Sequence, residues 1–163
     1  MTPLDALIDK LLDREGGIAD VGDGKGVTSW GQTPAWLAEF NLSVPENREQ
    51  AASNYLIWLE EIGLKPLLTP WDDLADILLD IAVMSSAQKA VKALQSALGV
   101  PVDGVLGPRT MAALSGSDRR QLARNVIAWD IEYQGRVITD NPQRAEYAAG
   151  WAKRMAAHVR RLA

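Results

Sequence analysis

Apolar residues recur at helical spacing at the start of the chain, and they predict its first element. The positions that share this period are Leu4, Leu7, Ile8, Leu11 and Leu12. They predict a helix from about residue 3 to Glu15, which Gly16-Gly17 ends because glycine readily adopts the conformation that closes a helix. Short runs of β-forming residues then flank the turn dipeptide Asp23-Gly24. This arrangement predicts a small hairpin over about residues 18–30.

Proline residues mark the starts of several later helices. Thr33-Pro34, Thr69-Pro70 and Asn141-Pro142 each place proline after a residue that caps helices, and Val44-Pro45 also opens a helix. The predicted helices cover residues 34–40, 45–61, 70–84, 87–98, 108–115, 118–138 and 142–162. The turn-rich segment "GVPVDGVLGPRT" is the one candidate for a subdomain boundary. The sequence therefore predicts a mainly α fold with a small β-hairpin near the amino terminus.

The amino-acid composition excludes several kinds of functional site. A chain of 163 residues is about the size of one domain. It has no cysteine and a single histidine, His158, so it lacks the residues for a disulfide framework, a thiolate metal site or a histidine cluster. We expect no metal and no cofactor. We expect His158, among arginines, to lie at the surface.

The amino terminus and the longest apolar runs argue against membrane insertion. No run reaches the ~20 apolar residues of a membrane span, and residues 1–15 lack the basic start and apolar core of a signal peptide. We therefore expect a soluble protein made in the cytoplasm.

Charge is unevenly distributed. Residues 1–87 hold 15 acidic and 5 basic residues, whereas residues 88–163 hold 6 and 12. A basic half suits an anionic polymer, either nucleic acid or the bacterial cell wall. The basic residues expected to contact it are Arg119, Arg120, Arg124, Lys153, Arg154, Arg160 and Arg161.

Glu15 falls on the apolar stripe of the first helix, because Leu4, Ile8, Leu11 and Glu15 follow one another at intervals of four, three and four. Partial burial and the negative end of the helix dipole both favour its protonated form. A protonated carboxyl group near neutral pH is what a general acid requires. The alternative is a glutamate that extends into solvent from the last helical turn.

The glycine-rich loop after Glu15 does not fit three familiar motifs. Lys25 is followed by glycine, so it is not a phosphate-binding loop, and no strand precedes it as a dinucleotide fingerprint requires. The spacing of acidic residues also fails the calcium-loop pattern. What remains is a pair of carboxylates, Glu15 and Asp23, with the hydroxyl of Thr28. Cleavage of a glycosidic bond uses such a pair, one as acid and one to activate water or stabilise the transition state.

These residues resemble the phage-type muramidases of glycoside hydrolase family 108. The signature "EGGI…D…G.T..G.T" is similar to their amino-terminal motif. The stretch "LLDIAVMSSAQKAVKALQSALGVPVDGVLGPRTMAAL" resembles their Asp-x-Ala-Val-Asn segment and the start of their peptidoglycan-binding region, and "GWAKRMAAHV" resembles their closing helix. The resemblance covers nearly the whole chain and implies a lysozyme-like helical domain. It implies a muramidase catalytic region over residues 1–87 and a peptidoglycan-binding-like region over residues 88–163, packed together.

The resemblance implies roles for individual residues. Glu15 matches the catalytic acid, and Asp23 and Thr28 match residues that assist water, with Asp20 as a competing carboxylate. The implied substrate-binding residues are Asp20, Trp30, Gln32 and Asp80. Of the six tryptophans, only Trp30 adjoins the loop, and the others are expected in the core or at its edge.

Several positions depart from the family pattern. Ile18 stands where the family often has tyrosine, Gln32 where it has isoleucine, and Met84 where it has asparagine. Asp73 and Asp76, on one side of their predicted helix, are expected to face solvent, and Asp80 is the exception because the family has aspartate there.

The resemblance implies hydrolysis of the β-1,4 bond between N-acetylmuramic acid and N-acetylglucosamine in peptidoglycan. Without a signal peptide, such a protein would need a holin-like pore or cell breakage to reach the wall, which fits a phage or prophage endolysin. One alternative is a weak or inactive wall-binding or export-associated protein on the same fold, and another is a nucleic-acid binder. A lytic transglycosylase, which needs no water-activating partner, would leave 1,6-anhydro ends. Inversion requires carboxyl groups about 6.5–9.5 Å apart and retention about 5–5.5 Å. We favour the wider spacing, with products initially in the α configuration.

Overall fold

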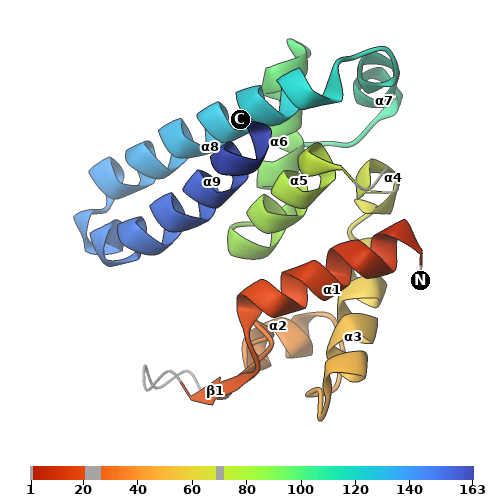
Figure 1. Ribbon diagram of the computed structural model, residues 1–163, viewed down its shortest axis with the longest axis vertical. Coiled ribbons are helices and arrows are strands. Elements are labelled where there is room, and N and C mark those ends of the chain that lie inside the picture. Colours follow the sequence, from red (N-terminus) through yellow and green to blue (C-terminus); the bar gives the residue numbers. More distant parts are fainter. Residues whose placement is uncertain (1, 21–26, 69–71) are drawn as a thin grey trace. The chain divides into compact units, whose positions relative to one another are not determined.

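The computed structural model describes residues 2–20, 27–68 and 72–163, and its contacts divide the chain into two compact units, Met1–Trp71 and Asp72–Ala163 (Figure 1). Each unit is described by itself. The predicted functional regions, 1–87 and 88–163, stay a prediction, since a functional boundary need not coincide with a boundary between compact units. Residue 87 begins the second helix of the second unit.

The first unit begins with α1 (Pro3–Glu15), which has the bounds expected from the sequence. Thr2 and Asp5 form a reciprocal capping box: Asp5 N–H donates to Thr2 Oγ1 over 3.1 Å, and Thr2 N–H donates to Asp5 Oδ2 over 2.7 Å. The apolar stripe is buried, with Leu7 and Leu11 at 0% exposure. Gly16 ends the helix at a φ of 74°, a conformation that glycine adopts without steric cost.

A hairpin follows α1, as predicted. β1 (Ile18–Asp20) pairs antiparallel with β2 (Val27–Ser29), with Ile18 opposite Ser29 and Asp20 opposite Val27. The predicted turn at Asp23-Gly24 lies outside the described residues.

Three helices complete the first unit: α2 (Pro34–Glu39), α3 (Arg48–Glu61) and the single turn α4 (Lys65–Leu68). The sequence pattern predicts α2 and α3, but the predicted start of α3 at Pro45 is wrong, because Asn47 caps the helix by accepting the backbone N–H of Gln50 and α3 begins at Arg48. Four residues are too few for α4 to show a helical period. α3 packs along α1. Arg48 on α3 joins them at the surface, because its guanidinium donates to the carboxylates of Asp9 and Asp13.

The second unit consists of helices joined by loops, and its described residues include no strand. Its elements are α5 (Asp73–Met84), α6 (Ala87–Leu98), α7 (Pro108–Ser115), α8 (Arg119–Asp140), a 3₁₀ helix η1 (Pro142–Tyr147) and α9 (Ala148–Leu162). α5, α6 and α8 pack against one another, and α9 lies along α8 and also contacts α5 (Figure 1). Residues 74–82 of α5 are all buried, which makes α5 the centre of this unit. No helix in the described part of the chain is both long and apolar enough to cross a membrane.

The C-terminal elements differ slightly from the prediction. The predicted helix over 142–162 divides into η1 and α9, and the helix predicted from 118 begins at Arg119, because Asp118 caps it by accepting backbone N–H groups from Arg120 and Gln121. The helix predicted over 70–84 corresponds to α5, which begins at Asp73 after the cap residue Asp72; the predicted start at Thr69-Pro70 lies outside the described residues.

Two burial predictions are wrong. His158 is 2% exposed and Asp76 is 1% exposed, although both are predicted at the surface. His158 Nε2 lies 2.6 Å from Asp80 Oδ2, and Arg161 Nη2 lies 2.6 Å from Asp76 Oδ2. Contacts between α5 and α9 therefore satisfy these buried polar groups: a hydrogen bond joins His158 to Asp80, and an ion pair joins Arg161 to Asp76.

Candidate active site

Glu15 is the last residue of α1, and its side chain packs against Gly31. A Cβ atom added to Gly31 would lie 2.7 Å from Glu15 Oε2 and 3.0 Å from the Tyr55 hydroxyl oxygen. Both oxygen atoms therefore lie at the same face of this glycine. Glu15 is half-buried, as its place on the apolar stripe predicts, and its carboxyl group lies against Gly31.

Gly31 belongs to a tight turn that follows β2. Ser29 N–H donates to Gln32 O over 3.3 Å, and Gln32 N–H donates to Ser29 O over 3.0 Å. The two central residues have positive φ, 50° for Trp30 and 76° for Gly31, which is the type I′ geometry. A bulky residue such as tryptophan rarely adopts positive φ, and such strain persists only where the surroundings enforce it.

The surroundings of Trp30 do enforce this conformation. Trp30 N–H donates to Gly17 O over 3.1 Å, and Tyr55 Oη donates to Trp30 O over 2.9 Å. Tyr55 is 2% exposed, and its ring packs against Trp36 and Trp58 at centroid distances of 5.5 and 6.0 Å. A rigid aromatic cluster thus holds the strained turn against Glu15. The sequence pattern predicts a core role for Trp58, but not the hydroxyl contact of Tyr55.

Gln32 follows this turn but is not placed to bind substrate. It is 1% exposed, and both ends of its amide are used inside the unit. Nε2 donates to Ala51 O over 2.8 Å, and Oε1 accepts from Asn54 Nδ2 over 2.8 Å. The structure corrects the prediction of a substrate contact, because Gln32 instead links the turn to α3.

The water-assisting residues are only partly described. Thr28 is half-buried on β2 and pairs with Ala19, so it lies on the hairpin that continues from α1. Asp20 pairs with Val27 through its backbone, and its side chain lies outside the described part of the structure. Asp23 lies outside the described residues altogether. The roles of these three residues remain predictions.

Asp80, predicted to bind substrate, is fully buried in the second unit. It is 0% exposed and contacts His158 Nε2 at 2.6 Å and Arg154 Nη1 at 3.4 Å. The guanidinium of Arg161 donates to His158 Nδ1, so His158 Nε2 carries the proton that is donated to Asp80. This placement corrects the prediction: Asp80 organises the packing of α5 against α9.

Asp130 joins the same buried cluster from α8. It is 2% exposed and accepts a hydrogen bond from Gln134 Nε2. Burial raises the pKa of Asp130 to about 6 and outweighs the hydrogen bond from Gln134, which lowers it; the negative charge of Asp80 adds a smaller upward effect.

Most of the basic residues expected to contact a polymer have partners inside the second unit. Arg119 pairs with Asp72, Arg154 with Asp80 and Arg161 with Asp76. Arg120 and Arg124 both donate to Leu162 O, over 2.9 and 3.1 Å. The charge asymmetry of the sequence therefore serves internal packing to a large extent. Lys153 and Arg160 are exposed.

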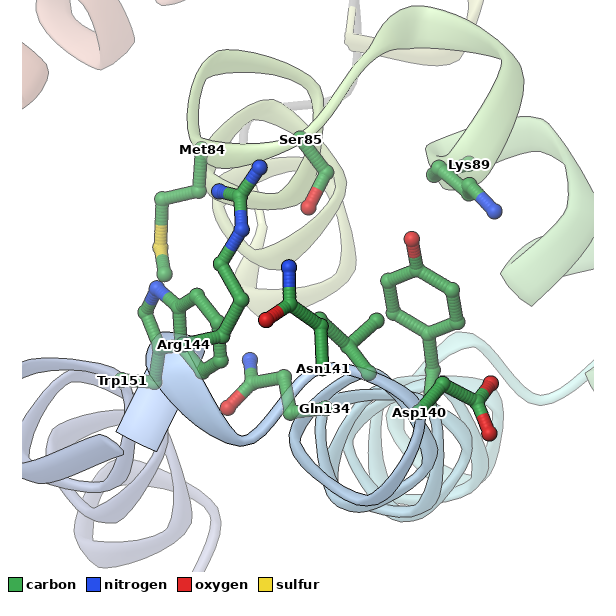
Figure 2. Close-up of a pocket in the computed structure, with 10 residues that line it drawn as sticks. Met84, Ser85, Lys89, Gln134, Asp140, Asn141, Arg144 and Trp151 are labelled. Carbon is green, nitrogen blue, oxygen red and sulfur yellow. The ribbon is translucent and has the colours of Figure 1, made fainter. Parts of the chain in front are cut away.

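The second unit also contains a groove that sequence reasoning missed. Met84 lines it, together with residues from α6, α8, η1 and α9 (Figure 2). The groove combines aromatic rings, amides and cations, which is the mixture expected of a binding site for a polar ligand. It has no sequence signal, because its residues lie on separate elements. Among the described residues, no group of three or more histidine, aspartate or glutamate side chains could hold a metal ion.

Comparison with known proteins gives two findings. Residues 89–156, less than half of the chain, match the family model described as "Predicted Peptidoglycan domain". The chain is also similar to a solved structure titled "Structure of Brucella abortus SagA", with a TM-score of 0.75 and 22% sequence identity. That likeness covers 98% of this chain and 92% of the other. No curated protein matches the chain.

The likeness to the Brucella abortus structure shows the fold alone. The prediction of a mainly α fold with a small β-hairpin near the amino terminus is confirmed. The family match supports a role connected with peptidoglycan.

Proposed function

We propose that this protein is a muramidase that hydrolyses the β-1,4 bond between N-acetylmuramic acid and N-acetylglucosamine in peptidoglycan. Glu15 is the general acid that protonates the leaving oxygen. Water attacks the anomeric carbon with help from Asp23 and Thr28, and Asp20 and Trp30 contact the substrate. We assign it to the phage-type muramidases of glycoside hydrolase family 108.

The observation that carries this proposal is the fixed position of Glu15 beside the strained turn. Its Oε2 abuts Gly31, and Trp30 is held at a positive φ by hydrogen bonds to Gly17 and Tyr55. Strain enforced on this scale is found where geometry must be kept for function. The match of residues 89–156 to a peptidoglycan family model supplies the substrate class.

The biological setting follows from the proposed activity. An endolysin of a phage or prophage is made in the cytoplasm and reaches the wall through a holin-like pore. Peptidoglycan is its partner, and neither nucleic acid nor membrane insertion has a part in it.

A second candidate is a weak or inactive wall-binding or export-associated protein. Met84 favours it, because a thioether replaces the amide expected there and is a poor hydrogen-bonding group. Met84 lines a groove, where that loss would affect a ligand.

The two candidates differ in whether the protein releases soluble fragments from purified peptidoglycan. Wild-type protein and Glu15→Gln are each mixed with insoluble walls, and both bound protein and soluble fragments are measured. A muramidase binds in both forms and releases fragments only as wild type. Binding by both forms with no release by either would support the second candidate.

A further inference from the structure

The groove in the second unit has a volume of about 450 Å³ and an aromatic wall. Trp151 from α9 and Tyr133 from α8 supply the rings, and both are half-buried. Tyr133 stacks on Trp129 at a centroid distance of 5.4 Å, and Trp151 packs against Tyr147 at 6.0 Å. Because neighbouring rings hold them, these two side chains offer firm surfaces to a ligand at little entropic cost.

Two cations and one carboxylate line the same groove. Lys89 Nζ lies 4.2 Å from the centre of the Tyr133 ring, and Arg144 comes from η1. Asp140 is the acidic residue, and Figure 2 shows its carboxylate directed away from Arg144. The formal charge of the lining is positive by one, so it favours a ligand with a localised negative charge.

Neutral polar groups lie beside Arg144. Figure 2 shows the Ser85 hydroxyl, the Asn141 amide and the Arg144 guanidinium facing one opening. Asn141 Oδ1 accepts the backbone N–H of Gln143 over 3.2 Å, which orients the amide. Gln134 lines the groove too. Amide side chains of this kind suit the amide groups of a peptide or of an N-acetyl substituent.

We propose that this groove binds the peptide-substituted part of a peptidoglycan strand, with Arg144 and Lys89 on carboxylates of the stem peptide. The amides of Asn141 and Gln134 bind its peptide groups, and Trp151 packs against the sugar that carries it. The inference rests on the proposed function only in taking peptidoglycan as the polymer.

The charges of the groove favour this ligand over other polymers. An unsubstituted chitin-type chain has no charge and would leave the guanidinium without an anionic partner. A nucleic acid presents phosphates continuously and would bring some of them close to Asp140, which repels them. A stem peptide carries a few carboxylates separated by amides, which matches separated cations with amides between them.

Binding is measured by isothermal titration calorimetry with Glu15→Gln protein, so that no ligand is cleaved. The probes are a disaccharide tetrapeptide, the same disaccharide without peptide, and chitotetraose. We expect the disaccharide tetrapeptide to bind at least about tenfold more tightly than chitotetraose, which is uncharged, and more tightly than the disaccharide without peptide, which carries only the lactyl carboxylate of its N-acetylmuramic acid. A tenfold preference corresponds to about 1.4 kcal/mol. Equal affinity for the disaccharide tetrapeptide and for the two probes without peptide would overturn the inference.

A variant of Arg144 tests the residue itself. Arg144→Gln removes the charge from an exposed side chain, and the matched control is Arg136→Gln, an exposed arginine of α8 outside the groove that lies 4.0 Å from Glu132. We expect Arg144→Gln to lose the preference for the tetrapeptide while thermal unfolding is unchanged, and Arg136→Gln to keep both. An unchanged preference in Arg144→Gln would also overturn the inference.

Failure of the proposed function gives a different result. If wild type releases no fragments but Arg144-dependent binding persists, the muramidase proposal fails and the groove stands. If release depends on Glu15 but binding ignores Arg144 and the peptide, the groove proposal fails and the muramidase stands.

Discussion

Glu15 Oε2 lies 2.7 Å from the point where a Cβ atom would stand at Gly31. Gly31→Ala would therefore push the carboxyl group of Glu15 out of its position and would also strain a backbone with a φ of 76°. Displacements of about 1 Å can lower an enzymatic rate by about 10²-fold. We expect Gly31→Ala to lower the initial rate of wall digestion by about this factor.

Gly63 offers a matched control within the same unit. Its φ is 68°, and nothing lies within 4 Å of its added Cβ. Gly63→Ala should lower the free energy of unfolding by about 1–2 kcal/mol, as Gly31→Ala does, because alanine is strained at a positive φ. It should keep the wild-type rate of wall digestion. Equal rates for the two variants would show that contact with Glu15 is unimportant.

Thr28 tests the proposed handling of water. Thr28→Val keeps the β-branched shape on β2 and removes the hydroxyl, so the hairpin should remain while the rate of fragment release falls at least tenfold. Thr139→Val, at an exposed position of α8, is the control for a lost hydroxyl group. Wild-type activity in Thr28→Val would assign the residue to strand structure alone.

The basic residues of the second unit should divide into two groups. Arg119 forms hydrogen bonds with Asp72, the N-cap residue of α5, whereas Arg160 is exposed. Arg119→Gln should lower the melting temperature, because it removes a partner of a half-buried carboxylate. Arg160→Gln should leave it unchanged and weaken wall binding at low salt more than at high salt, because exposed charges are screened. Thermal unfolding measures the melting temperatures, and sedimentation with insoluble walls measures binding. A lower melting temperature for Arg160→Gln and an unchanged one for Arg119→Gln would contradict the structure.

Asp130 makes stability depend on pH. Its pKa is raised to about 6 in the folded protein, so the folded state binds more protons than the unfolded state between about pH 4 and pH 6. The free energy of unfolding therefore falls as pH rises through this window. Asp130→Asn should be more stable than wild type by about 1–3 kcal/mol above pH 6, and equal to it below about pH 4.

Denaturant titrations at pH 4 and pH 7.5 measure this difference. Glu146→Gln, an exposed carboxylate of η1, is the control and should show no such pH dependence. A stability difference between Asp130→Asn and wild type that is the same at both pH values would contradict burial of the carboxylate.

The sequence predicts those features that depend on local pattern. The bounds of α1 follow from its apolar period and from Gly16-Gly17, and the same period places Glu15 on the buried stripe. The burial of His158 could not be predicted, because its partner Asp80 lies 78 residues away and the two meet only when α9 packs on α5. A lone histidine among arginines has the local signature of a surface position.

The same limit applies to the candidate site. Glu15 Oε2 and the Tyr55 hydroxyl meet at the same glycine, Gly31, because α3 packs against α1, and no local period encodes this arrangement. For Gln32, the sequence predicts a contact that the structure does not show. Its polar side chain next to the loop suggests a ligand contact, but its amide donates a hydrogen bond to α3. Sequence pattern thus identifies the residues near the turn, and packing decides their roles.

The central claim is that Glu15 supplies a proton for hydrolysis, and the products of peptidoglycan digestion test it most directly. Fragments released by wild type and Glu15→Gln are compared by mass spectrometry at equal protein concentration, with unfolding curves confirming that both are folded. We expect wild type to release fragments with free reducing N-acetylmuramic acid ends, and Glu15→Gln to release them at least about 10²-fold more slowly. Equal rates for the two proteins, or 1,6-anhydro ends in the wild-type products, would contradict the account.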